Sequence, residues 1–244
     1  MKYFVAGNWK THLTGPQATE LAQQVVSQSN YPGVAVFPPS VYAERVAAIT
    51  ASTDVSMGLQ DISESGQGAT TGDICAEQAR DVGASYVLVG HSERRQRQAE
   101  SSEWVAAKAL AAVKAGLIPV VCVGETLDQR ESGEQVEVVA QQLSPVLDLL
   151  DPSADWMVAY EPVWAIGTGK TASAQQAQDM HHAIRQQLSA AGMGNTKILY
   201  GGSVKAANAA ELALGPDVDG ALVGGAALKI EEFAAIVDAF REKS

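Results

Sequence analysis

Three side chains suited to proton transfer stand directly after short apolar runs of the sequence. Lys10 lies in GNWK, His91 in GHSE and Glu161 in YEP. A carboxylate and an imidazole suit proton transfer at a carbon next to a carbonyl, because the carboxylate removes the proton while the imidazole polarises the oxygen. A lysine adds positive charge for the enediolate that develops. Each residue alone is more often structural, so the interpretation depends on all three lying together.

Two pairs of glycines follow the last two apolar runs: Gly201-Gly202, just before Ser203, and Gly224-Gly225. Without a Cβ, a glycine permits positive φ or the close approach of backbone N–H groups to an anion. Ser203 is also expected to begin the next helix, whose first N–H groups favour a phosphate. The pattern therefore predicts a small phosphorylated substrate.

The segment YEPVWAIGTGKTA contains glycine spacings that match parts of two nucleotide-binding motifs. A dinucleotide site needs a strand running straight into the first glycine and an acidic residue about 20 positions later, and neither is present. A phosphate-binding loop would need glycine where the chain has Trp164. We therefore expect a lid that closes over the site and excludes water. Its residues are Pro162, Val163, Trp164, Ala165, Ile166, Gly167, Thr168, Gly169 and Lys170.

Eight short apolar runs alternate with amphipathic segments along the chain. They lie near residues 3, 34, 55, 86, 118, 156, 197 and 220. Continuous apolar runs are typical of parallel strands covered by helices on both faces. Eight such units in a chain of this length predict a (β/α)8 TIM barrel, with residues 1–244 as a single domain; a doubly wound sheet is the alternative. Barrel active sites lie at the C-terminal ends of the strands, so Lys10, His91 and Glu161 are expected at one rim.

Two helical segments carry more detailed expectations. The segment 101–116 has a polar start and a glycine stop. The residues expected on its apolar face are Trp104, Ala107, Leu110 and Ala111. Ser144 followed by Pro145 is expected to divide the segment 134–150 into two helical pieces.

The composition disfavours several classes of protein. The chain has 17 basic and 28 acidic residues, a formal net charge of -11, which makes nucleic acid and anionic membranes poor partners. Cys75 and Cys122 show neither metal-site spacing nor a disulfide framework, and the adjacent His181 and His182 are expected to be surface or capping residues rather than ligands. The apolar stretch near the N-terminus is too short for a signal peptide, and no segment approaches transmembrane length. This predicts a cytoplasmic protein.

The chemically suited residues stand in blocks that closely resemble the triosephosphate isomerase family across the whole chain. These blocks are GNWK (7–10), VGHSERR (89–95), CVGETL (122–127), YEPVWAIGTGK (160–170), LYGGSVKAAN (199–208) and DGALVGGA (219–226). The resemblance implies an isomerase that interconverts dihydroxyacetone phosphate and D-glyceraldehyde 3-phosphate in glycolysis and gluconeogenesis, with no cofactor and no metal.

The resemblance also implies a role for individual residues. The catalytic residues that it implies are Asn8, Lys10, His91, Ser92, Glu93 and Glu161. Among them, Glu161 resembles the base, His91 the neutral electrophile and Lys10 the electrostatic stabiliser. Glu93 resembles a partner of Lys10, and Ser92 helps to open the short helix after His91. The substrate contacts that it implies are Asn8, Lys10, Gly167, Ser203, Gly224 and Gly225.

A homodimer is a further implication, in which the long loop at residues 61–73 crosses to the active site of the neighbouring subunit. Thr71 matches the threonine that reaches across. The chain departs from the common family pattern at Thr11 and His12, and at Thr70, where the family often has a bulky residue. Losing buried aromatic area is expected to weaken association by about 1–2 kcal/mol, at about 25 cal/mol per Å².

Two other functions fit part of the pattern. Another phosphosugar barrel enzyme, such as an epimerase, would usually bring metal ligands, and only His91 follows a strand here. A catalytically inactive barrel that serves as a binding or scaffold protein should have lost Lys10, His91 or Glu161, and all three are present.

Overall fold

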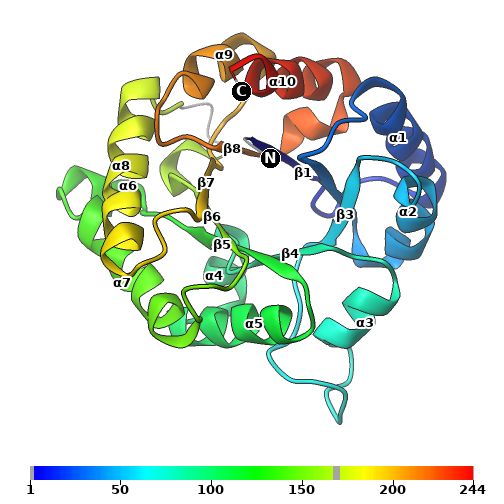
Figure 1. Cartoon of the computed structure of the whole chain (residues 1–244), viewed down its shortest axis with the longest axis horizontal. Coiled ribbons are helices and arrows are strands. Elements are labelled where there is room, and N and C mark those ends of the chain that lie inside the picture. The colour runs from blue at the N-terminus through cyan, green and yellow to red at the C-terminus, as the bar shows by residue number, and fades with distance from the viewer. Residues whose placement is uncertain (1–2, 167–170, 244) are drawn as a thin grey trace.

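The computed structural model describes residues 3–166 and 171–243, which form a closed barrel of eight parallel strands (Figure 1). The strands are β1 (Phe4–Asn8), β2 (Val34–Phe37), β3 (Ser56–Leu59), β4 (Tyr86–Val89), β5 (Ile118–Val123), β6 (Met157–Tyr160), β7 (Lys197–Tyr200) and β8 (Gly220–Val223). Each strand pairs with its sequence neighbours, and β1 also pairs with β8, where Phe4 lies opposite Gly220. This closure confirms the barrel and contradicts the doubly wound sheet, which would leave two edge strands unpaired.

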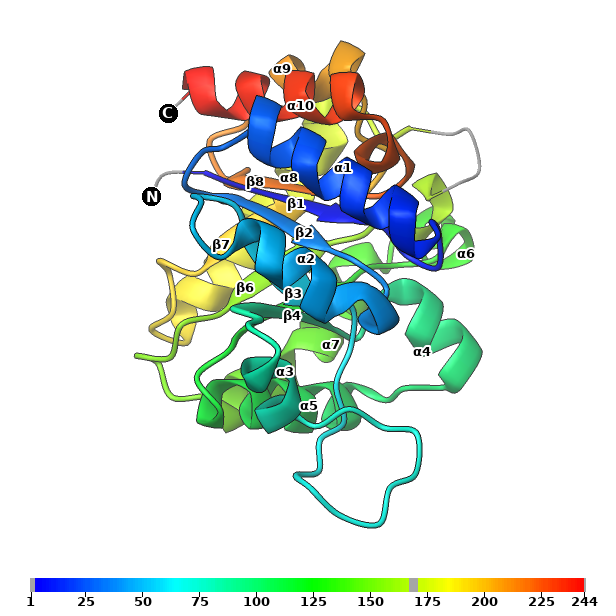
Figure 2. The same ribbon diagram turned by 90° about the vertical axis from the view of Figure 1, so that its right-hand side faces the viewer.

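Helices surround the barrel, as Figures 1 and 2 show from two directions. The α-helices are α1 (Gly15–Gln28), α2 (Ala43–Thr50), α3 (Ala76–Asp81), α4 (Ser92–Gln98), α5 (Ser102–Lys114), α6 (Leu127–Glu131), α7 (Gln135–Leu149), α8 (Ala174–Ala190), α9 (Ala206–Ala213) and α10 (Ile230–Lys243). The short 3-10 helices in the described residues are η1 (Ser40–Tyr42), η2 (Val163–Ala165) and η3 (Gly225–Leu228).

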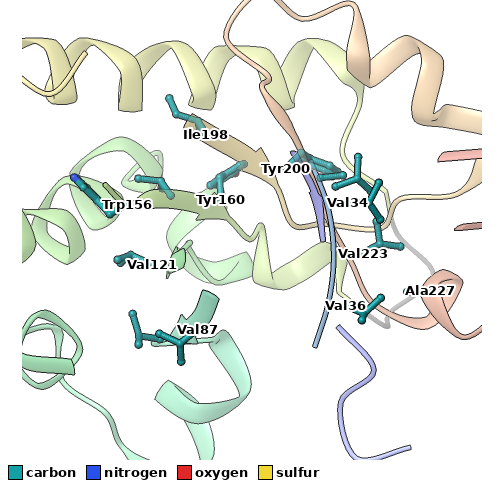
Figure 3. Close-up of a cluster of buried hydrophobic side chains, with 14 of the residues drawn as sticks. Val34, Val36, Val87, Val121, Trp156, Tyr160, Ile198, Tyr200, Val223 and Ala227 are labelled. Atoms are coloured by element: carbon teal, nitrogen blue, oxygen red, sulfur yellow. The ribbon is translucent and has the colours of Figure 1, made fainter. Parts of the chain in front are cut away.

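The strands are buried on both faces, which explains why their sequences are continuously apolar. Side chains that point into the barrel form one cluster, which includes Phe4, Phe37, Leu88, Val120 and Leu199. Side chains on the outer face pack beneath the helices in a second, larger cluster. Figure 3 shows part of it, including Val34, Val36, Val87, Val121, Ile198 and Val223. Close packing on both sides makes the strand ends a rigid frame for the rim residues.

Two expectations about helices are wrong. On α5 the buried residues are Val105, Ala106, Lys108, Ala109 and Ala112, whereas Trp104 is 39% exposed. Lys108 faces inward because its ammonium bonds Asp61 and Glu100. A prediction from the spacing of apolar residues therefore assigned the wrong face of α5 to the core. The helix α7 runs continuously through Pro145, since Val139, Leu143 and Val146 hold it against the barrel on both sides of the proline.

A long loop between β3 and α3 projects from the body of the molecule, as the cyan trace in Figure 2 shows. Residues 64–73 are all exposed. At the base of the loop, the Ser63 N–H donates to the Ile74 carbonyl at 2.8 Å, and both carboxylate oxygens of Asp61 accept from Lys108 at 2.8 and 2.9 Å. The loop is thus anchored at its stem, while its outer part packs little against its own chain.

Candidate active site

A cavity of about 630 Å³ lies at the C-terminal ends of the strands. Its lining includes the expected residues Asn8, Lys10, His91, Glu93, Glu161, Ser203, Gly224 and Gly225. Ser92 does not line this cavity, but its N–H contacts one residue that does. The structure therefore brings together residues at the ends of β1, β4, β6, β7 and β8, as expected for a barrel whose active site lies at the C-terminal ends of its strands. Gly167, Thr168, Gly169 and Lys170 lie outside the described residues.

The carboxylate of Glu161 is held by two donors directly after β6. Nε2 of His91 lies 3.0 Å from its Oε1, and the N–H of Ser92 donates to its Oε2 at 2.9 Å. Glu161 is only 2% exposed and His91 6% exposed. A buried carboxylate needs such donors because its charge is poorly solvated. Both carboxylate oxygens are occupied in this arrangement.

A backbone hydrogen bond orients the ring of His91 so that Nε2 faces Glu161. His91 is the N-cap of α4, and its Nδ1 accepts the N–H of Glu93 at 3.2 Å. A nitrogen that accepts a hydrogen bond carries no proton, so Nε2 is the donor toward Glu161. The helix begins at Ser92, as expected, and its N-terminus favours the uncharged ring. His91 can therefore present its Nε2 to the cavity as a hydrogen-bond donor.

The two groups shift each other's titration. Burial raises the pKa of Glu161, but the adjacent His91 and the Ser92 N–H lower it, and the net direction is downward. Burial lowers the pKa of His91, but the Glu161 carboxylate raises it, and the net direction is upward. If Glu161 turns toward a ligand, both pairwise causes weaken and burial remains. The pKa of the carboxylate then rises and the pKa of the imidazole falls, which gives a stronger base and a neutral donor.

Lys10 is fixed by contacts on both its backbone and its side chain. Its N–H donates to Asn8 Oδ1 at 3.0 Å, and its carbonyl accepts from Gln60 at 2.8 Å. The ammonium lies 2.6 Å from Glu93 Oε1, which agrees with the expected pairing of these residues. The φ angle of Lys10 is 49°, a left-handed conformation that costs a non-glycine residue about 1–2 kcal/mol. This strain, at a residue that points a charge into the cavity, is typical of functional positions.

The positive φ expected at the glycine pairs is absent, and Gly201 has a steric reason of its own. None of Gly201, Gly202, Gly224 and Gly225 has positive φ. A Cβ on Gly201 would lie 2.9 Å from Cγ of Glu161, and a Cβ on Gly224 would lie 3.6 Å from Cε of Lys10. Gly201 therefore leaves room for the carboxylate side chain rather than for an unusual turn.

The helix start expected at Ser203 is displaced. The helix α9 begins at Ala206, and the Ala206 N–H already donates to Oε2 of Glu232 at 3.1 Å. The N-terminus of α9 is thus partly satisfied by a carboxylate. Gly224 and Gly225, at the start of η3, also line the cavity.

The described part of the expected lid starts as a short helix beside the cavity. Val163–Ala165 form η2, and Ile166 lines the cavity. The Trp164 indole donates to Oε1 of Glu125 at 2.8 Å, and the Val163 N–H donates to the Glu125 carbonyl at 3.0 Å. Glu125 is fully buried, and Tyr160 also donates to Oε1 at 3.0 Å. Sequence reasoning missed Glu125, although it follows β5 as His91 follows β4.

The expectation for the two helical histidines is half wrong. His182 is exposed and pairs with Asp217 at 3.1 Å, as a surface residue would. His181 is fully buried on α8, and its Nδ1 lies 3.2 Å from the Asp217 carbonyl. Its ring packs edge-on against Tyr160, with centroids 5.9 Å apart. Burial lowers the pKa of His181 to about 4.

Acid is expected to destabilise the fold through His181. The unfolded histidine takes a proton near pH 6.5 and the folded one only near pH 4, so stability is lost as the pH falls between these values. A shift of this size corresponds to about 3 kcal/mol. Urea unfolding of the native protein and His181→Gln at pH 7 and pH 4 should give free energies whose difference shrinks by that amount. Parallel pH profiles would contradict the assignment. Asp61 contributes to the pH dependence with the opposite sign, because burial raises its pKa to about 6. Its contribution is the same in both proteins and cancels in the comparison.

Two further findings concern the described residues only. Within residues 3–166 and 171–243, no three His, Cys, Asp or Glu side chains are grouped closely enough to hold a metal ion. In the same ranges, no helix combines the length and the apolar character needed to cross a bilayer.

The geometry supports one chemical operation. A buried carboxylate, an imidazole and an ammonium face one cavity that glycine backbone also lines. A ligand with an anionic end at the glycines would place its other end between Glu161 and His91. That arrangement suits removal of a proton from a carbon while the neighbouring oxygen is stabilised.

Comparison with known proteins gives a consistent result. A family model described as triosephosphate isomerase matches residues 3–240. The triosephosphate isomerase of Pseudomonas entomophila (strain L48) is 52% identical over 240 residues, covering 95% of this chain and 96% of that protein. The triosephosphate isomerase of Pseudomonas putida (strain W619) is 50% identical over 240 residues, with the same coverage. That of Stenotrophomonas maltophilia (strain K279a) is 50% identical over 242 residues, covering 96% of each.

Proposed function

The chain belongs to the triosephosphate isomerase family, and from this premise we propose which of its residues carry out the reaction. It is an isomerase that interconverts dihydroxyacetone phosphate and D-glyceraldehyde 3-phosphate, a step of glycolysis and gluconeogenesis. The observation that carries the assignment of roles is the contact between Glu161 and His91 at the cavity shared with Lys10.

Glu161 is the base in this proposal. It leaves His91 and Ser92, turns toward the substrate and takes the proton from the carbon next to the carbonyl. The electron pair of that C–H bond forms the C=C bond of an enediolate, and the carbonyl π electrons move onto oxygen. The hydroxyl proton on the deprotonated carbon passes to the former carbonyl oxygen, and the C–O bond that lost it becomes the new carbonyl. The C=C electron pair then takes the proton back from Glu161 at the neighbouring carbon, so that no atom is gained or lost. The upward pKa shift of Glu161 on leaving His91 makes the first step easier.

His91 and Lys10 stabilise the charge that appears on oxygen. Once Glu161 has turned away, Nε2–H of His91 is free to donate to the substrate oxygens. Lys10 supplies the positive charge, and Asn8 and Glu93 hold it in place through the contacts described above. Because these donors are fixed before substrate arrives, they need little reorganisation during the reaction.

The phosphate is proposed to bind where Ser203, Gly224 and Gly225 line the cavity. Ser203, Gly224 and Gly225 supply backbone N–H groups there, with Lys10 nearby. Gly167 is proposed to add a further contact when residues 162–170 close over the substrate. The bond between Trp164 and Glu125 holds the first turn of this lid. We propose no cofactor and no metal, residues 1–244 as a single domain and the cytoplasm as the site of action.

A solvent-exchange experiment tests this function. The purified protein is given D-glyceraldehyde 3-phosphate in D2O with EDTA, and the product is followed by a coupled assay and by NMR. A proton held on Glu161 exchanges with solvent, so we expect rapid turnover and deuterium on the carbon next to the carbonyl. Absence of turnover would contradict the function. Turnover without deuterium would contradict transfer through an exchangeable carboxyl group.

A homodimer is the second part of the proposal, formed through the loop at residues 61–73. The loop projects from the barrel (Figure 2), and residues 64–73, which include Thr71, are exposed. A loop that packs so little against its own chain is suited to a partner's surface. Sedimentation at micromolar concentration should show a dimer, and Thr71→Asp should shift it toward monomer. A fully active monomer of the native chain would contradict the proposal.

A further inference from the structure

The backbone of Glu161 rests against a glycine at the end of the neighbouring strand. Gly124 follows β5, and a Cβ at this position would overlap the carbonyl oxygen of Glu161. Just before it, the Val123 carbonyl accepts the Glu161 N–H at 2.7 Å. The N–H and the carbonyl of Glu161 therefore both contact residues 123–124, and this segment fixes the backbone of Glu161. The position of the carboxylate depends on how that short segment is held.

The side chain of Gln142, on α7, holds this segment. The Gly124 N–H donates to Oε1 of Gln142 at 2.7 Å, and Nε2 of Gln142 donates to the Gly124 carbonyl at 3.0 Å. The amide thus satisfies the donor and the acceptor of one residue, as a further strand would. Glycine is the most freely rotating residue, so its peptide groups need such a restraint beyond the end of the strand.

The same region contains a small cavity behind the carboxylate. Its volume is about 150 Å³, and its lining includes Gln142, Gly124, Ser92 and Glu161. Space on this side means that close packing does not fix Glu161 there. The hydrogen bonds of Gln142 therefore carry more of the restraint than they would in a filled core.

From these contacts we propose that Gln142 is a positioning residue for the reaction, acting through Gly124 on the backbone of Glu161. The inference rests on the proposed role of Glu161 as the base. Gln142 does not line the substrate cavity, so its effect should fall on the chemical step and not on phosphate binding. A displacement of about 1 Å in a reacting group can cost about 100-fold in rate.

Gln142→Met tests the proposal, because methionine has a similar length and forms neither hydrogen bond. We expect kcat to fall by about 10- to 100-fold with KM little changed. Inhibition by inorganic phosphate should stay as in the native enzyme, since the substitution does not displace Gly224 and Gly225, where the phosphate is proposed to bind. With substrate deuterated at the transferred position, the isotope effect on kcat should rise as proton transfer becomes slower.

Gln142→Glu separates the two hydrogen bonds. The carboxylate still accepts from the Gly124 N–H, but it repels the Gly124 carbonyl instead of donating to it. We expect a comparable loss of kcat. The matched control is Gln141→Glu, which makes the same charge change at the adjacent, exposed residue, whose amide donates to Glu137. This control should keep native kcat.

The outcomes separate this inference from the one on which it rests. Native activity that is lost in Glu161→Gln, measured in the same assay, establishes the base. Given that result, a kcat for Gln142→Met within about twofold of native overturns the positioning role alone. Equal losses of kcat and phosphate affinity would also overturn it, because they would show general loosening of the barrel.

Discussion

Glu161→Gln is expected to lower kcat/KM by about 10³-fold or more, the range of a positioned base. Glutamine keeps the shape of the side chain, but its amide cannot take a proton from carbon. Glu161→Asp should cost about 100-fold, because the shorter side chain withdraws a working carboxylate by about 1 Å. Steady-state kinetics in the coupled assay give both values.

The order of the two Glu161 variants is itself informative. A positional effect alone would place aspartate below glutamine, whereas the base role requires the reverse. The matched control is Glu232→Gln, because Glu232 lines the same cavity but its carboxylate binds the Ala206 N–H at the start of α9. It is expected to cost much less. A Glu161→Gln enzyme within a few-fold of native would remove Glu161 from the proposed mechanism.

Lys10→Met is expected to lower kcat/KM by about 10²- to 10³-fold, as loss of a preorganised charge does elsewhere. The chain carries a net charge of -11, which should repel a dianionic substrate, so capture depends on local positive charge. Methionine keeps the apolar stem and removes only the ammonium. Glu93 then faces the cavity without its partner at 2.6 Å, which adds to the repulsion.

Two other lysines provide the comparison for Lys10. Lys229→Met changes an exposed lysine that lines the same cavity, and Lys114→Met changes an exposed lysine at the end of α5. All three variants alter the total charge equally. We expect a large loss only for Lys10, and kcat should fall together with affinity because the charge acts on the enediolate as well as on the phosphate. Equal losses for the three would show that Lys10 acts only through net charge.

Much of the fold and the centre of the site are predictable because each depends on local sequence. The eight apolar runs became eight strands, since burial on both faces requires continuous apolar residues. The residues that follow strands converge because all strands of the barrel point the same way. The sequence alone therefore predicts that His91 and Glu161 lie at one rim.

The remainder depends on contacts between distant segments. Gln142 looks like an ordinary helical glutamine until Gly124 is placed beside it. Lys108 marks the inward face of α5 only because Asp61 and Glu100 lie opposite. The helix α9 begins at Ala206, whose N–H bonds Glu232 from the later helix α10, and not at the expected Ser203. Such side-chain partnerships leave no periodic pattern in the sequence.

The pairing of β1 with β8 has a consequence during synthesis on the ribosome. Because β1 pairs with β8, a nascent chain exposes an unpaired apolar strand edge until residues 220–223 have emerged. Such an edge can pair with another chain, and aggregation is then the main hazard for the incomplete protein. The pairing of β1 with β8 also brings two parts of the site together, because Lys10 follows β1 and Gly224 follows β8. The site is therefore incomplete until residues 220–225 have been made, and shorter nascent chains should depend on chaperones.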